Sequence, residues 1–248
     1  MYINPTAQRF MIWASIAAAT LYGIGFWYLT DFIPPPSPTL SADQVVHLYA
    51  DHNFKFRIGV VACLMAGGFN APWTVALAVQ MARCERGVPI WAIAQFAGGV
   101  LGTILFTFPP LFWGVAAFSV DRDPALTLLM HELAFLTLVT PVSFFWIQAL
   151  PIGIVCFTRT DATHSAFPRW LGYFTVFMVV SAELGVIAQL FKSGPFAWNG
   201  LFTFWIPLTV FAVWFGVLDY TMLKAIGRQS DARAGTETSL GAGQRSWA

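Results

Sequence analysis

The stretch "IWAIAQFAGGVLGTILFTFPPLFWGVAAF", from Ile90 to Phe118, contains no charged side chain. About 20 apolar residues of helix are enough to cross the ~30 Å hydrocarbon core of a bilayer. This stretch exceeds that length, so a helix there has to tilt, kink or project from the membrane. The stretch therefore predicts a transmembrane helix, and the rest of the chain repeats the same pattern.

The composition excludes a soluble globular protein. Of the 248 residues, 57% are hydrophobic and only 10% are charged, and the mean hydropathy is +0.66, whereas soluble domains carry about 25% charged residues. So little polar surface cannot cover a water-soluble body of this size. The net charge of +1 gives no indication of a nucleic-acid partner.

Six stretches meet the length requirement for a span, and the sequence predicts an all-α, polytopic membrane helix bundle. The predicted spans are Phe10–Leu29, Ile58–Met81, Ile90–Phe118, Ala125–Phe157, Trp170–Phe191 and Phe196–Tyr220. The first could be a cleaved signal peptide, but its aromatic end at Phe26–Tyr28 is typical of a membrane interface and favours a retained helix.

Basic residues in the connections predict the orientation. Nine Lys and Arg side chains fall on the side of the two termini and four on the other side. The richer side is expected to be cytoplasmic, so both termini are predicted inside, in a multi-pass protein of the bacterial inner (plasma) membrane. Residues 1–228 form the predicted membrane domain, and the polar, Gly-rich residues 229–248 form a predicted disordered cytoplasmic tail.

One connection is long, and it comprises external residues 31–57. Ser41 followed by Gln44 resembles a capping box, which predicts a short amphipathic helix from Ala42 to about Asn53. This helix is expected to lie on the membrane or over the bundle mouth. His47 and Asp51 lie one turn apart, but a solvated helix face explains them as well as a metal does, so we predict no metal site.

Ionisable and polar residues inside the spans are the candidate site. His131 and Glu132 lie in "LLMHELAFL", Glu183 lies in the fifth span and Asn70 in the second. Charges in a bilayer are costly and mark function by default. We predict that His131 or Glu132 shares a polar pocket, directly or through water, with Glu183 or Asn70. A purely structural clamp between helices is the alternative.

These residues give the candidate roles. Catalytic candidates are His131, Glu132 and Glu183, and candidate ligand-binding residues are these three with Asn70 and Trp73. Zincin chemistry is excluded because Phe135 stands where HExxH needs its second histidine. His131 is the only histidine inside a predicted span, which argues against a bis-histidine haem. No cofactor is predicted, and general acid–base chemistry remains open. Asp219 is expected near the inner interface, close to Lys224.

Prolines are expected to make several spans irregular, because each removes a backbone hydrogen bond and frees a carbonyl. We expect the fourth span to be interrupted at two of them and the second, third and sixth at one place each. The prolines concerned are Pro72, Pro109–Pro110, Pro141, Pro151 and Pro207.

Five short stretches carry a resemblance. They are "PPPSPTLSADQV", "LYADH", "APW", "DRDP" and "GPFAWNG", and together they resemble a group of bacterial six-helix membrane proteins to which no activity is assigned. The resemblance extends to about Gly227 and implies a topology, not a mechanism. There is also a looser similarity to emopamil-binding-type sterol isomerases, which use His and Glu inside a helical bundle, although their residue spacing is not reproduced here.

Three functions follow as hypotheses. The first is an integral membrane protein that binds a lipophilic small molecule in an outward-biased cavity. The second is an intramembrane acid–base enzyme, such as an isomerase of a sterol-like or terpenoid substrate. The third is a small transporter or an accessory subunit. Expected partners are membrane lipids or a lipophilic ligand, with a membrane-protein partner or a homo-oligomer also open.

Overall fold

The structure is a computed structural model that describes residues 4–159 and 165–245, with side chains described as far as residue 232. Within these ranges every regular element is helical. Segments η1 and η4 are π-helical, and η2 and η3 are 3-10 helices. In chain order the elements are α1 (Pro5–Ile24), η1 (Gly25–Leu29), α2 (Ala42–Ala50), α3 (Asn53–Ala66), η2 (Gly67–Phe69), α4 (Asn70–Ala82), α5 (Ile90–Gly102), α6 (Ile104–Phe118), α7 (Pro124–Val139), α8 (Ser143–Thr158), α9 (Arg169–Glu183), η3 (Leu184–Leu190), η4 (Leu201–Trp205) and α10 (Ile206–Arg245).

Six helical segments of the described chain are long and apolar enough to cross a membrane, which confirms the predicted fold class. They are Pro5–Leu29, Asn53–Ala82, Ile90–Phe118, Pro124–Thr158, Arg169–Leu190 and Leu201–Ala232. Each predicted span falls on one of these segments. The prediction succeeds because span length and apolar composition are local properties of the sequence.

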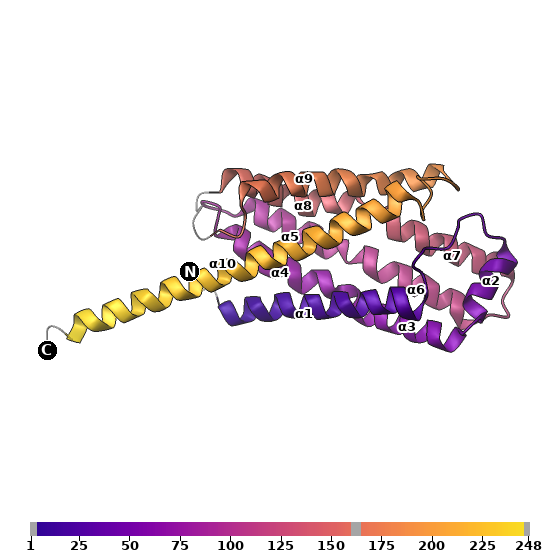
Figure 1. Ribbon diagram of the computed structural model, residues 1–248, viewed down its shortest axis with the longest axis horizontal. Coiled ribbons are helices and arrows are strands. Elements are labelled where there is room, and N and C mark those ends of the chain that lie inside the picture. The colour runs from indigo at the N-terminus through magenta and orange to yellow at the C-terminus, as the bar shows by residue number, and fades with distance from the viewer. Residues whose placement is uncertain (1–3, 160–164, 246–248) are drawn as a thin grey trace.

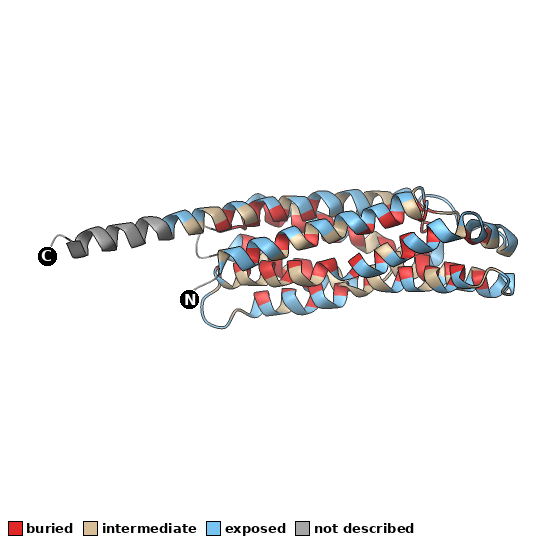
Figure 2. Cartoon of the chain, turned by 90° about the horizontal axis from the view of Figure 1, so that it is seen from below, coloured by how far each residue is buried: buried red, intermediate tan, exposed pale blue. Residues whose placement is uncertain are grey.

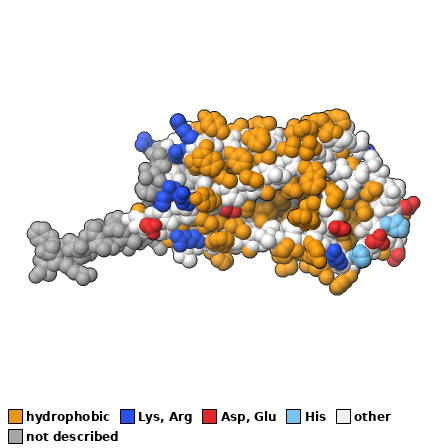
Figure 3. Space-filling view, in the orientation of Figure 1, with side chains coloured by type: hydrophobic (Ala, Val, Ile, Leu, Met, Phe, Trp, Pro, Cys, Tyr) orange, Lys and Arg blue, Asp and Glu red, His pale blue; other side chains and the backbone are white. Residues whose placement is uncertain are grey.

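The segments form one elongated bundle with both chain ends at the same end (Figure 1). We name this the terminal end; it holds the start of α1, the α8–α9 connection and the second half of α10. The opposite end, which α2 covers, is the cap end. On the face shown in Figure 3, Lys and Arg gather at the terminal end, whereas Asp and His gather at the cap end. Which side of the membrane each end faces stays a prediction.

The outer surface of the bundle is apolar. Buried residues line the inward faces of the helices, and the outward faces are exposed (Figure 2). Large apolar side chains on these outward faces are strongly exposed, among them Met65 and Phe54 at 78% and Tyr173 at 70%. Exposed apolar surface of this extent suits contact with lipid rather than water.

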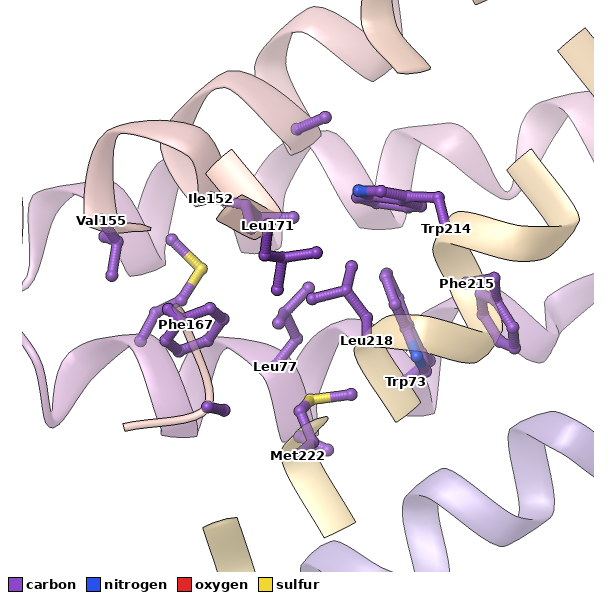
Figure 4. Packing of buried hydrophobic residues seen from close by; sticks show 14 of the residues in the cluster. Trp73, Leu77, Ile152, Val155, Phe167, Leu171, Trp214, Phe215, Leu218 and Met222 are labelled. Carbon is purple, nitrogen blue, oxygen red and sulfur yellow. The ribbon is translucent and has the colours of Figure 1, made fainter. Parts of the chain in front are cut away.

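Two buried clusters hold the bundle together. In the terminal cluster, Trp73 stacks on Phe215 with ring centroids 4.8 Å apart and meets Trp214 edge-on at 5.6 Å. Figure 4 shows Leu77, Leu218 and Met222 packed beside them. The cap cluster is built mainly from aromatic rings, including Phe26, Phe32, Tyr49, Phe56, Trp113, Phe135, Trp198 and Phe204.

Two predicted proline interruptions agree with the structure. The 3-10 segment η2 precedes Pro72, whose missing N–H would otherwise bond to the Gly68 carbonyl. In the fourth span, α7 ends at Val139 just before Pro141, which has no N–H to continue the helical hydrogen bonds. A third interruption agrees with the prediction, because Pro207 follows the π-helical segment η4, which runs directly into α10 in the sixth span.

Other interruptions are predicted wrongly. Pro109–Pro110 lies inside α6 and Pro151 inside α8. The third span breaks instead at Thr103, whose N–H donates to the Val100 carbonyl at 3.2 Å in a tight turn.

The C-terminal segment differs from the expected picture. Helix α10 runs without a break from Ile206 to Arg245 and projects from the bundle (Figure 1). The sequence instead predicts a disordered tail from residue 229. The boundary between the membrane domain and a tail therefore stays a prediction.

Candidate functional site

The predicted external helix is present as α2. The Gln44 backbone N–H donates to Ser41 Oγ at 3.3 Å, and the Ser41 N–H donates to Gln44 Oε1 at 2.9 Å, which completes the capping box. The helix ends at Ala50 rather than near Asn53. It is shorter because the chain turns at His52, whose φ is 53°, before α3 begins.

Helix α2 caps the bundle by packing against α7. Val45 and Tyr49 are fully buried, whereas Leu48 is 37% exposed and His52 lies in solvent. The buried face of α2 is therefore formed by Val45 and Tyr49. The described residues contain no group of three or more His, Cys, Asp and Glu side chains that could hold a metal, including around His47.

Tyr49 places a phenol hydroxyl on the candidate histidine. Its Oη lies 2.8 Å from His131 Nδ1, and His131 is only 1% exposed. Burial raises the pKa of Tyr49 well above its usual value, so its hydroxyl stays protonated and can donate to the imidazole. His131 Nε2 is buried without a hydrogen-bond partner among the described residues.

Aromatic rings enclose the imidazole. Phe135 lies one turn along α7, with its centroid 4.8 Å from that of His131. Trp198 lies at 6.0 Å and Phe32, from the connection between η1 and α2, at 6.3 Å. These rings also contact one another, with Phe135 stacked on Trp198 at 5.6 Å. The site is therefore a packed aromatic core around one imidazole.

Further hydrogen bonds attach residues 31–57 to the bundle. Trp198 Nε1 donates to the Pro36 carbonyl at 2.8 Å. Asn53 Nδ2 donates to the carbonyls of Tyr49 at 2.8 Å and Ala117 at 2.9 Å. Together with the hydrogen bond between Tyr49 and His131, these bonds hold residues 31–57 against the rest of the bundle.

The expected shared polar pocket does not form by direct hydrogen bonds. Glu132 points away from His131 and pairs with Lys192 at 3.5 Å, at a position where its side chain is 29% exposed. Adjacent helical residues point ~100° apart, so only one of the two faces the interior. Asn70 donates to the Gly99 carbonyl at 2.7 Å and accepts from Gln148 at 3.3 Å.

Glu183 has a different neighbour again. It is half-buried beside Trp146 of α8, and its Oε1 has no hydrogen-bond partner among the described residues. Trp146 and His131 are separated by about 20 Å of helix along the fourth span. The predicted site residues are therefore distributed over the bundle, because each faces a different neighbouring helix.

The sequence analysis missed the partner of Trp73. Its Nε1 donates to Asp219 Oδ1 at 2.7 Å, and Asp219 is only 4% exposed. Asp219 was expected near the inner interface, and its carboxylate is buried inside the bundle against Trp73, whereas its depth in the membrane stays a prediction. The signal was present, since a carboxylate within the apolar run of α10 needs a buried donor.

A cavity of about 220 Å³ lies at the terminal end, where sequence reasoning predicted no site. It is lined from the end of α8, the start of α9 and one face of α10. The lining residues are Arg159, Ser165, Ala166, Pro168, Trp170, Tyr220, Thr221, Lys224 and Arg228. Three of these are cations, and none of the described lining residues is acidic.

Two of the cations are fixed by backbone carbonyls. Arg159 Nη1 donates to the carbonyls of Cys156 at 2.9 Å and Phe167 at 2.6 Å. Arg228 Nη2 donates to the Ser165 carbonyl at 3.3 Å. Lys224 is exposed, with its Nζ 5.6 Å from the centre of the Tyr220 ring. The pocket thus carries positive charge from two separate elements.

The fold defines the chain as an integral membrane protein with six spans. The packed aromatic core around His131 lies at the cap end. The cavity lined by three cations, which we name the basic pocket, lies at the terminal end. No family model, curated protein or solved structure matches the chain. The functional argument therefore rests on the residues of these two places.

Proposed function

We propose that this protein binds an amphiphilic lipid at the terminal end, with the headgroup in the basic pocket and the acyl chains along α9 and α10. The observation that carries this proposal is the mixed lining of the cavity. Cations line it, and so do two membrane-facing aromatic side chains, Trp170 at 54% and Tyr220 at 63% exposure. Aromatic rings of this kind sit at headgroup level in membrane proteins.

The size of the cavity supports a headgroup rather than a whole ligand. Pockets for drug-sized molecules measure ~300–1,000 Å³, and this cavity measures about 220 Å³. Tyr173 and Phe177 follow Trp170 at helical spacing on the exposed face of α9. They give the apolar part of an amphiphile a surface outside the cavity.

The proposal moves the ligand from the outer half of the bundle to the terminal end. Around His131 the aromatic rings pack against one another, which supports a structural clamp there. The charge bias of the connections supports a cytoplasmic terminal end, and with it a site in the cytoplasmic leaflet of a plasma membrane.

The acid–base alternative has less support. It requires two titratable groups on one substrate, but His131 bonds to Tyr49 and Glu132 pairs with Lys192. No specific observation favours a transporter or an accessory subunit over lipid binding.

Lipid retention tests the proposal. The full-length protein is purified in a mild non-ionic detergent, and its bound lipids are counted by native mass spectrometry. Replacing the aromatic wall, Trp170→Ala with Tyr220→Ala, is expected to remove the retained lipid. Trp13→Ala is the matched control, because Trp13 is 59% exposed on α1 outside the pocket. Equal retention by the double variant and the control contradicts the proposal.

A further inference from the structure

The positive charge of the basic pocket limits which lipid headgroups it favours. Arg159, Lys224 and Arg228 line one cavity without a described carboxylate among them. Basic pockets between transmembrane helices on the cytoplasmic side are suited to anionic headgroups. Arginine presents a planar fork of N–H donors that matches phosphate oxygens, and lysine acts as a point charge.

The geometry of α10 brings two of the cations to the same place. Tyr220, Lys224 and Arg228 are spaced four residues apart, so they lie one above another on one helix face. Arg159 lines the cavity from the end of α8, with Nη1 fixed by two backbone carbonyls. A bound anion would therefore meet donors from two sides.

The start of α9 adds to this positive field. Pro168 is the N-cap of α9 and offers no side-chain cap, and both Pro168 and Trp170 line the cavity. The first backbone N–H groups of a helix lack helical partners and carry partial positive charge, which favours an anion. The start of α9 and the three cations line the same cavity.

The charge of the cavity favours one headgroup chemistry. A phosphodiester carries one negative charge, whereas a phosphate monoester carries about −1.5 to −2 at pH 7. The three cations that line the cavity are better matched by the monoester.

We propose that the pocket takes the phosphate monoester headgroup of an anionic lipid in preference to a phosphodiester. This inference rests on the proposed lipid-binding function and names its ligand class. Arg159 and Arg228 hold the phosphate oxygens in place, and Lys224 swings from the Tyr220 ring to neutralise the second charge.

A lipid titration tests the inference. Full-length protein in a neutral detergent is titrated with phosphatidate, phosphatidylglycerol, cardiolipin and phosphatidylcholine of the same acyl chains, and bound lipid is measured by native mass spectrometry. One extra charge near a basic site corresponds to about a fivefold change in affinity. Phosphatidate is therefore expected to bind about fivefold tighter than phosphatidylglycerol.

Variants identify the pocket as the origin of that preference. Lys224→Gln is expected to weaken phosphatidate binding about fivefold, while Lys224→Arg retains it. Lys55→Gln is the matched control, because Lys55 also lies over a tyrosine ring, with its Nζ 4.8 Å from the centre of Tyr28, but near the cap end. Thermal unfolding of each variant checks that the fold is intact. An equal loss in Lys55→Gln overturns the assignment to this pocket.

The remaining outcomes separate the inference from the function on which it rests. Equal binding of phosphatidate and phosphatidylglycerol, or tighter binding of cardiolipin, overturns the monoester inference and leaves lipid binding standing. Inorganic phosphate and glycerol 3-phosphate are added as water-soluble competitors. If they bind the pocket while no lipid does, the proposed lipid-binding function is overturned.

Discussion

The hydrogen bond between Tyr49 and His131 is expected to stabilise the whole cap end. Tyr49→Phe removes one hydroxyl and keeps the ring, whose centroid lies 5.0 Å from that of Phe56 and 6.3 Å from that of Phe32. The variant leaves His131 Nδ1 without a partner at a residue that is 1% exposed. An unsatisfied buried polar group costs about 1–3 kcal/mol, so we expect a loss of that size in the free energy of unfolding.

The measurement is equilibrium unfolding in mixed detergent, with intrinsic tryptophan fluorescence as the signal. Tyr28→Phe is the control, because Tyr28 is 69% exposed and its hydroxyl has no described partner. A surface change of this kind is expected to stay within about 0.5 kcal/mol of the unaltered protein. Hydrogen exchange then locates the effect, which should appear as faster exchange in α2.

A double-mutant cycle distinguishes the hydrogen bond from a general loss of packing. His131→Leu removes the imidazole, and the double variant leaves neither partner unsatisfied. Side chains in direct contact show coupling energies of about 0.5–3 kcal/mol, so the two changes should cost less together than the sum of their separate effects. Strictly additive losses in the free energy of unfolding would show that Tyr49 and His131 do not stabilise each other. A Tyr49→Phe variant as stable as Tyr28→Phe would refute the stabilising hydrogen bond as well.

Three further predictions concern the orientation, the bond between Trp73 and Asp219, and the pH dependence of the Tyr49 contribution. Reporter fusions near Arg86 and at the C-terminus should give a cytoplasmic signal and fusions near Asp43 an external one, and a reversed pattern would overturn the orientation. Trp73→Phe removes the donor to buried Asp219 and should destabilise the protein by about 1–3 kcal/mol in the same unfolding assay; an unchanged stability would show that the bond contributes nothing. Because burial raises the pKa of Tyr49 above its unfolded value of about 10, its contribution is constant below pH 10 and decreases as pH rises between the unfolded and folded pKa values. The stability gap between the unaltered protein and Tyr49→Phe should therefore narrow above pH 10, and a constant gap in unfolding titrations would contradict the shift.

Local features could be predicted from the sequence because their causes are local. The six spans follow from runs of apolar residues, and the start of α2 follows from Ser41 and Gln44. Either His131 or Glu132 was expected to face the interior, and His131 does. Its partner was not predicted, since nothing in the pattern shows that α7 packs against α2 rather than α9.

Long-range features could not be predicted because they depend on which helices meet. Gly98 and Gly99 illustrate the point. A Cβ on Gly98 would lie 2.5 Å from the Gln148 backbone nitrogen, so only glycine permits α5 and α8 to approach this closely. That close packing brings Gln148 to Asn70 and removes Asn70 from the predicted pocket. The basic pocket was missed because its cations come from separate elements.

Several polar residues inside the spans of this chain join neighbouring helices. Charged and polar residues at bilayer depth mark function by default, yet most of those singled out here have partners within the bundle. His131 has Tyr49, Asn70 has Gln148, and Asp219 has Trp73. Each pair joins two helices, as interhelical hydrogen bonds in membranes commonly do. A site that binds an external ligand has to keep charge available at a surface that the ligand can reach. The described cations at the terminal end meet that requirement, because Lys224 and Arg228 are exposed beside a cavity with no described carboxylate in its lining.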